Sequence, residues 1–291
     1  MIVKEIVKEK IASLLSGDEE IQSVEQLGGM TNQNYLVKTS SNQYIVKFFG
    51  KGTDKLIDRK NEKFNIELLK DLKLDVENYL FDIEAGIKVN QYIENAETLD
   101  SATIKTKFEK IAPILQTIHA SGKELKGEFA PFEEIKKYES LIQGEISYPN
   151  YEAVRKSVLS LKNELEKIGI EKKSCHIDLV PENFIEGPDG HLYLIDWEYS
   201  SMNDPMWDLA ALFLESEFTP EEEEDFLAHY ESEKTPVSRE KIRIYKILQD
   251  IIWSLWTIYK EENGADFGDY GISRYNRAVK ELDFKGGSYE N

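Results

Sequence analysis

The chain has 291 residues, 41% of them hydrophobic and 11% aromatic, so it can bury a substantial core and is not a disordered chain. A formal net charge of −19 repels nucleic acid and anionic membrane surfaces, so neither is an expected partner. Cys175 is the single cysteine, which excludes an internal disulfide and fits a reducing cytoplasm, and no apolar run reaches membrane-spanning length.

The first 90 or so residues read, in order, as a helix, three strands, a helix and two strands. The start is an amphipathic helical pattern rather than a signal peptide. The clearest of these elements cover residues 2–15 (helix), 35–37 and 44–49 (strands), 58–72 (helix), and 76–82 and 87–92 (strands). We assign residues 1–92 to an N-terminal nucleotide-binding lobe.

The remainder of the chain is mostly helical in pattern. The expected helices cover residues 102–120, 132–143, 151–168, 238–262 and 269–282, with two more starting at Pro205 and Pro220. Asp204 precedes the first of those two prolines as a helix cap, and Thr219 with Glu222 can form a capping box at the second. The composition and the spacing of hydrophobic residues change at residues 91–95, so we expect a hinge there. We expect a second lobe, which is catalytic and binds the acceptor, over residues 93–291.

The most informative segment runs from His176 to Trp197. Asp178 and Asn183 lie on one short loop, and Asp196 follows an apolar strand at residues 192–195. In phosphoryl transfer from a nucleotide, one carboxylate orients the attacking hydroxyl while an amide and a second carboxylate hold Mg²⁺ on the phosphates. A chance match in a polar loop is the alternative, and the position of Asp196 at a strand end argues against it. The pattern predicts Asp178 as the catalytic residue and Asn183 and Asp196 as metal ligands.

This segment resembles the catalytic loop of the choline kinase and aminoglycoside phosphotransferase families, which share the bilobal fold of protein kinases. Its continuation over residues 196–210 is similar to bacterial choline kinases in particular, and the resemblance runs from about Leu27 to the last helix. It implies an α+β protein kinase-like fold with a small antiparallel-sheet N-lobe and a larger, mainly helical C-lobe. It also implies phosphorylation of the choline hydroxyl to phosphocholine, with ATP and Mg²⁺ as cofactors.

On the nucleotide side, the glycine-rich turn at residues 27–34 and Lys47 stand out. Taken alone, they read as an ordinary hairpin turn and an exposed lysine. Glycines let backbone N–H groups approach phosphate oxygens, and Lys47 matches the phosphate-binding lysine of the family, with Glu62 as its expected carboxylate partner and Glu67 as the alternative. The residues assigned to the nucleotide site are Lys47, Glu62, Gly29, Thr31, Asn32, Gln91, Tyr92 and Ile93.

On the acceptor side, Trp253 and Trp256 are three residues apart and share a helix face. Such a pair is more often part of a core, but choline kinases carry a Trp-x-x-Trp pair at this point. A quaternary ammonium has no N–H to donate and is held by aromatic faces through cation–π interactions. The resemblance implies Trp253, Trp256 and Tyr270 as cage walls, with Glu215 and Tyr199 near the acceptor cation.

Three further residues receive structural assignments. Asp208 lies in an apolar stretch after a helix start. In kinase-like folds a carboxylate here braces the catalytic loop, and we expect that role rather than a solvated position. We expect His119 and Cys175 to be core residues.

Other activities stay open on the sequence. The acceptor alternatives are ethanolamine, an aminoglycoside or another small alcohol. A catalytically inactive binding module is disfavoured, because Lys47, Asp178, Asn183 and Asp196 are all present, and a protein kinase is disfavoured because no Ala-Pro-Glu segment occurs. The expected partners are small-molecule substrates, and the expected assembly is a monomer or a homodimer.

Overall fold

The computed structural model describes the chain except for residues 1, 12, 29–31, 51 and 287–291. The chain divides into two compact units. Unit 1 comprises Met1–Ile104 and Pro181–Ser200, and unit 2 comprises Lys105–Val180 and Ser201–Asn291. No helix among the described residues is both long and apolar enough to span a membrane.

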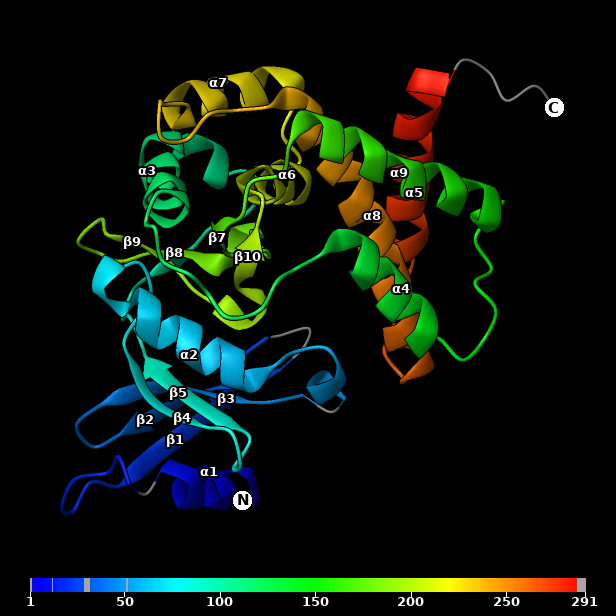
Figure 1. The fold of residues 1–291 in the computed structure, drawn as a ribbon. Coiled ribbons are helices and arrows are strands. Elements are labelled where there is room, and N and C mark those ends of the chain that lie inside the picture. The colour runs from blue at the N-terminus through cyan, green and yellow to red at the C-terminus, as the bar shows by residue number, and fades with distance from the viewer. Residues whose placement is uncertain (1, 12, 29–31, 51, 287–291) are drawn as a thin grey trace. The chain divides into compact units, whose positions relative to one another are not determined.

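Unit 1 is built on an antiparallel sheet with the strand order β1-β2-β3-β5-β4, shown in Figure 1. Its helices and strands are α1 (Ile2–Ile11), β1 (Ile21–Gln26), β2 (Gln33–Thr39), β3 (Gln43–Phe48), α2 (Arg59–Leu69), β4 (Asn78–Asp82), β5 (Ile87–Gln91), β6 (Glu97–Thr98), β8 (Phe184–Glu186) and β9 (Leu192–Leu194). Short 3-10 turns are η1 (Thr53–Lys55), η2 (Lys70–Leu72), η4 (Pro181–Asn183) and η5 (Trp197–Tyr199). Alternating apolar residues of the strands, such as Val37, Val46 and Val89, form a core that α1 helps to cover through Val7 and Ile11.

Residues 93–104 and 181–200 belong to unit 1, whereas the sequence placed a lobe boundary after residue 92. The reason is backbone pairing between distant segments. Strand β6 pairs with β8, Leu99 N donates to Phe184 O at 2.9 Å, and Leu194 N donates to Leu74 O at 2.8 Å. The segments carrying Asn183 and Asp196 are therefore attached to the sheet that carries Lys47.

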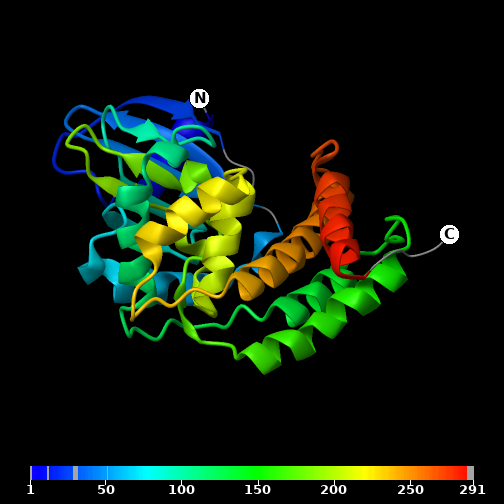
Figure 2. The same cartoon turned by 90° about the horizontal axis from the view of Figure 1, so that it is seen from above.

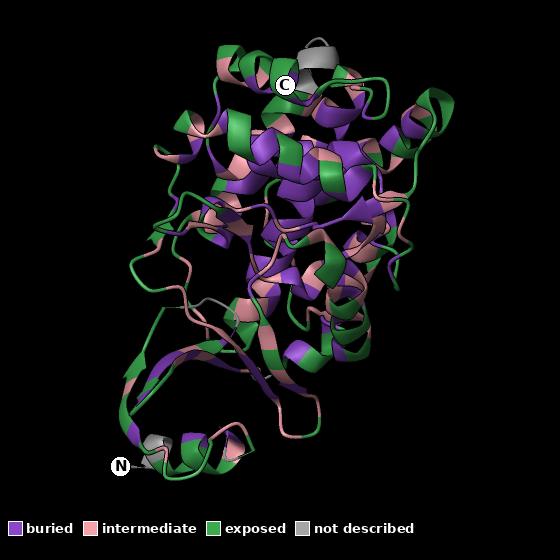
Figure 3. Cartoon of the chain, turned by 90° about the vertical axis from the view of Figure 1, so that its left-hand side faces the viewer, coloured by how far each residue is buried: buried purple, intermediate pink, exposed green. Residues whose placement is uncertain are grey.

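Unit 2 is mainly helical. Its elements are α3 (Phe108–His119), α4 (Pro131–Leu141), α5 (Tyr151–Ile168), β7 (Lys173–Cys175), β10 (Ser201–Asn203), α6 (Pro205–Glu215), α7 (Pro220–Tyr230), α8 (Arg239–Glu262) and α9 (Tyr270–Gly286), and the turn η3 (Ile104–Thr106) leads into them. Helix α8 packs against α4, α5, α6 and α9, and Figure 2 shows it in orange beside the red α9. Figure 3 shows the buried segments concentrated in these helices. Antiparallel strands β7 and β10 pair with each other and flank the catalytic segment in sequence.

Most expected elements are present, and their caps explain their starts. The predicted capping box forms, with Glu222 N donating to Thr219 Oγ1 at 3.3 Å and Thr219 N donating to Glu222 Oε2 at 2.8 Å. Asp204 caps α6 as expected. The helix predicted from residue 102 was wrong at its start, because Asp100 Oδ1 accepts from the backbone N–H groups of residues 102 and 103 and holds a turn there. Helix α3 begins only at Phe108.

Candidate active site

Lys47 and Asp196 form a partly buried ion pair within unit 1. Lys47, on β3, places its Nζ 2.6 Å from Oδ1 of Asp196. The lysine side chain is 8% exposed and the aspartate side chain 25% exposed. Asp196 has a φ of 68°, a left-handed conformation that aspartate tolerates, and it turns the chain from β9 into η5. A buried cation therefore lies against a carboxylate that still reaches water.

The expected pairing of Lys47 with Glu62 was wrong for this structure. Glu62 instead accepts from Lys88 Nζ and from Arg59 Nη1, each at 2.6 Å. Lys88, on β5, lies directly opposite Lys47 in the β3–β5 register, so both side chains emerge on the same sheet face. Burial alone would raise the pKa of Glu62, but the charges of Lys88 and Arg59 outweigh it and lower that pKa. The alternative partner, Glu67, is exposed.

Glu198 is a buried carboxylate that the sequence reasoning missed. Its Oε2 accepts from Asn32 Nδ2 at 2.8 Å and from Arg59 Nη1 at 2.9 Å. The Oδ1 of Asn32 accepts from Arg59 Nη2 at 3.2 Å and from Gly50 N at 3.3 Å. Burial, followed by the charge of Asp196, raises the pKa of Glu198. These bonds tie the end of the glycine-rich segment to the turn after Asp196.

The structure describes only some of the remaining residues that were predicted to bind the nucleotide. Gly29 and Thr31 lie outside the described residues. Gln91 is the last residue of β5, Tyr92 and Ile93 follow it, and all three are partly buried in unit 1. Their contact with a nucleotide stays a prediction.

The two expected metal ligands lie on connected segments. Ile195 N donates to Asn183 O at 2.8 Å, so the backbone beside Asp196 is hydrogen-bonded to the residue that carries the amide. Asn183 is buried and Asp196 is partly exposed. One amide and one carboxylate offer only hard oxygen donors, which fits Mg²⁺, an ion that takes few protein ligands and keeps waters.

In unit 2, Asp208 fixes the loop that carries Asp178. The two oxygens of Asp208, which is fully buried, accept from His176 N and Ile177 N, each at 2.8 Å. Trp207 Nε1 donates to Ile177 O at 3.0 Å. Ile177 has a φ of 79°, unusual for a β-branched residue, and these bonds hold it there. The predicted bracing contact of Asp208 is confirmed, and it fixes the backbone immediately before Asp178.

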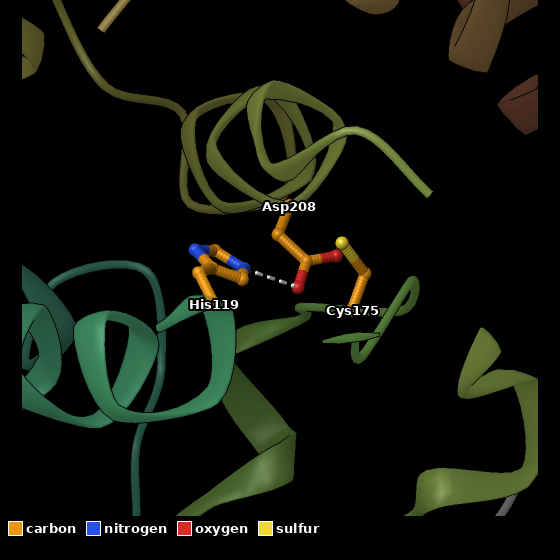
Figure 4. Close-up of side chains that lie close together, drawn as sticks. All are labelled: His119, Cys175 and Asp208. Atoms are coloured by element: carbon orange, nitrogen blue, oxygen red, sulfur yellow. Dashed lines mark hydrogen bonds and ion pairs between the residues drawn. The ribbon is translucent and has the colours of Figure 1, made fainter. Parts of the chain in front are cut away.

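His119, Cys175 and Asp208 lie close together in this brace (Figure 4), and His119 and Cys175 are buried as expected. His119 Nε2 is 3.1 Å from Asp208 Oδ2, and its Nδ1 is 2.7 Å from the hydroxyl of Tyr230. Their potential ligand atoms lie within 4.8 Å of one another. However, both imidazole nitrogens and both carboxylate oxygens already have protein partners, and burial raises the pKa of the Cys175 thiol well above its usual value. The cluster therefore fits a structural hydrogen-bond network better than a metal site.

The expected acceptor residues of unit 2 belong to a row of aromatic rings. Trp253 and Trp256 on α8 are 8% and 7% exposed, and their ring centroids lie 6.4 Å apart at 88°. Trp256 packs on Phe267 at 4.9 Å, and Phe267 lies 6.4 Å from Tyr270. The sequence reasoning missed Phe267, which belongs to an Asp-Phe-Gly triplet at residues 266–268 that forms a turn before α9. Aromatic faces thus extend from α8 to the start of α9.

Tyr270 connects these rings to charged groups. Burial raises its pKa, Arg274 opposes that shift, and the charges of Glu215 and Asp178 add to it, which places both carboxylates within electrostatic reach. Arg274 donates to the Tyr270 hydroxyl at 2.7 Å and to Glu215 Oε1 at 2.5 Å. The sequence reasoning missed Arg274, although its position one helical turn after Tyr270 was visible. Tyr199 lies in η5 of unit 1, and its acceptor role stays a prediction.

Comparison with known proteins identifies similar chains. The model of the choline/ethanolamine kinase family matches residues 24–279. Protein LicA of Haemophilus influenzae is 31% identical over 269 residues, covering 88% of this chain and 79% of that protein.

Two solved structures extend this similarity. The crystal structure of choline kinase LicA from Streptococcus pneumoniae is 74% identical with a TM-score of 0.94, covering 98% of this chain and 100% of that one. A LicA complex with AMP is 75% identical with a TM-score of 0.92, covering 98% of this chain and 99% of that one. The α+β, bilobal kinase-like fold expected from the sequence is confirmed.

Lys47 and Lys88, which face each other across β3 and β5, should respond differently to replacement by methionine. Lys88→Met should lower the free energy of unfolding by about 3 kcal/mol, because buried Glu62 loses one of its two cationic partners. Lys47→Met should cost under about 1 kcal/mol, since Asp196 reaches water, but it should reduce phosphoryl transfer about 100-fold. Urea unfolding and an ADP-release assay on both variants measure the two effects. A stable but inactive Lys88→Met variant would instead make Lys88 the phosphate ligand.

Proposed function

This chain belongs to the choline/ethanolamine kinase family, and we propose that it transfers the γ-phosphate of ATP to the hydroxyl of choline, giving phosphocholine. The observation that carries the proposal is the 74% identity to the choline kinase LicA of Streptococcus pneumoniae over 98% of this chain. The presence of Asp178, Asn183, Asp196 and Lys47 supports an active transferase over an inactive binding module.

Asp178 acts on the acceptor hydroxyl. In phosphoryl transfer through a loose transition state, the carboxylate orients the hydroxyl and accepts its proton late in the reaction. The hydrogen bonds that Asp208 accepts from the two preceding backbone N–H groups hold this carboxylate in place. The protein lowers the reaction barrier mainly by positioning the hydroxyl against the phosphate, which matters most in this kind of transfer.

The unit 1 residues serve the nucleotide, and the LicA complex with AMP supports a nucleotide site in this fold. Lys47 binds phosphate oxygens, and its ion pair with Asp196 supports this role, because the lysine lies beside a proposed metal ligand. Asn183 and Asp196 would hold Mg²⁺, which when bound neutralises charge on the transferring phosphate. Because ATP and choline are its substrates, we place the enzyme in the cytoplasm, where ATP is supplied.

The acceptor site suits choline better than its alternatives. Trp253, Trp256 and Tyr270 offer aromatic faces to a quaternary ammonium, each contributing about 0.5–2 kcal/mol through cation–π interaction. Ethanolamine, which the family also includes, carries N–H donors that need carboxylate acceptors. The carboxylate expected there, Glu215, is already bonded to Arg274. An aminoglycoside would need a large acidic pocket in place of this aromatic row.

A screen of acceptors tests the proposed function. The purified protein should release ADP with choline well above the rate with ethanolamine or an aminoglycoside, and ³¹P NMR should identify phosphocholine. The Asp178→Asn variant keeps the shape of the side chain but removes the base. It should lower kcat by about 1,000-fold, because loss of a positioned general base costs between about 10² and 10⁴ in rate. Equal turnover of choline by this variant, or a clear preference for another acceptor, would contradict the proposal.

The tryptophan pair gives an independent test of the acceptor. Trp256→Ala should raise the KM for choline about 30-fold, the equivalent of about 2 kcal/mol from a desolvated cation–π contact. The KM for ATP should stay within about 2-fold, and Trp256→Phe, which keeps an aromatic face, should recover most of the choline affinity. If both KM values rise together, Trp256 is a core residue and no part of the cage.

A further inference from the structure

We propose that Arg274 determines the selectivity of the acceptor site, by neutralising Glu215 and fixing Tyr270 so that a quaternary ammonium is preferred to a primary one. The inference rests on the proposed function, since it assigns a role within the same acceptor site. Arg274 lies on α9 and belongs neither to the catalytic loop nor to the tryptophan pair.

Arg274 makes two hydrogen bonds and one further ion-pair contact within unit 2. Its side chain is 5% exposed and donates to the Tyr270 hydroxyl at 2.7 Å and to Glu215 Oε1 at 2.5 Å. Its Nε lies 3.2 Å from Asp250 Oδ1. The guanidinium carbon also lies 5.1 Å from the Tyr270 ring centroid. One planar group therefore connects α9 to α6 and α8, a geometry that lysine cannot reproduce.

The cluster is balanced in charge. Asp250 also accepts two bonds from Arg277, at 2.6 and 2.7 Å, so two carboxylates face two guanidinium groups. Burial would lower the pKa of Arg274, but Glu215, Tyr270 and Asp250 together raise it, so the guanidinium stays charged. Burial raises the pKa of Asp250, and both arginines oppose that shift. The carboxylate of Glu215 consequently presents a compensated charge to the acceptor region.

This balance discriminates between the two amino alcohols. A trimethylammonium group cannot donate a hydrogen bond and gains from aromatic faces, so it tolerates a compensated carboxylate. A primary ammonium loses its bonds to water and needs a charged acceptor in exchange. With Glu215 engaged by Arg274, ethanolamine lacks that acceptor, while Tyr270 stays oriented as a wall of the cage.

The test compares kcat/KM for choline and for ethanolamine. In Arg274→Gln, the choline-to-ethanolamine ratio should fall about 10-fold, because the released carboxylate can accept a charge-assisted bond from the primary ammonium. In the double variant Arg274→Gln with Glu215→Gln, the charged acceptor is gone, so the ratio should return to within about 3-fold of the wild type, a difference of under about 1 kcal/mol.

Arg277→Gln is the matched control. It removes an arginine from the same helix that also binds Asp250, but the Arg277 side chain is 40% exposed, and within the described part of the chain it donates to Asp250 and not to Glu215 or Tyr270. Its ratio should stay at the wild-type value. If Arg274→Gln fails to fold, as judged by its thermal melt, Arg274→Lys replaces it, because lysine keeps the charge but cannot bond three partners together.

The outcomes separate this inference from the proposed function. Equal losses for both substrates in the Arg274 variant, with an unchanged ratio, would show that the residue serves stability alone. A change in the intrinsic tryptophan fluorescence on binding gives the Kd of each amino alcohol without turnover, so selectivity is measured even in a slow variant. Absence of ADP release with choline in the wild type would instead defeat the proposed function.

Discussion

A buried carboxylate that holds two consecutive backbone amides is the constraint on which the active site depends. Asp208 accepts from the N–H groups of His176 and Ile177, and His119 in turn contacts Asp208. Without these bonds Ile177 would leave its left-handed conformation, which costs about 1–3 kcal/mol in a non-glycine residue. Because Asp178 follows directly, this brace within unit 2 positions the carboxylate that we propose acts on the acceptor hydroxyl.

Charge neutralisation organises both proposed substrate sites in the same way. In unit 1, Glu62 lies between Lys88 and Arg59, which leaves Lys47 to Asp196. In unit 2, Arg274 satisfies Glu215 in a similar manner. An unpaired buried charge is strongly destabilising, so buried charged groups are paired. Which groups pair with each other therefore determines which charged group can bind a ligand. In the proposed function, this leaves Lys47 for the nucleotide and the aromatic faces for the acceptor.

The sequence predicted what depends on local order. The caps at Asp204 and Thr219 are set by neighbours a few residues away. The roles of Asp178, Asn183 and Asp196, which lie in one short segment, stay predictions. Prediction from the sequence failed where a side chain contacts residues that are far away along the chain. The Lys47 pairing depends on the β3–β5 register that brings Lys88 opposite, and the role of Arg274 depends on the packing of three helices, neither of which is encoded in a short pattern.

The most direct measurement is the turnover of Asp208→Asn, compared with its choline affinity from tryptophan fluorescence. The amide keeps the shape of the side chain but turns one acceptor into a donor facing a backbone N–H. We expect kcat to fall about 100-fold, as for a displacement of about 1 Å in a catalytic group, with the choline Kd unchanged. A folded variant with wild-type kcat, or one whose choline affinity falls as far as its rate, would contradict this account.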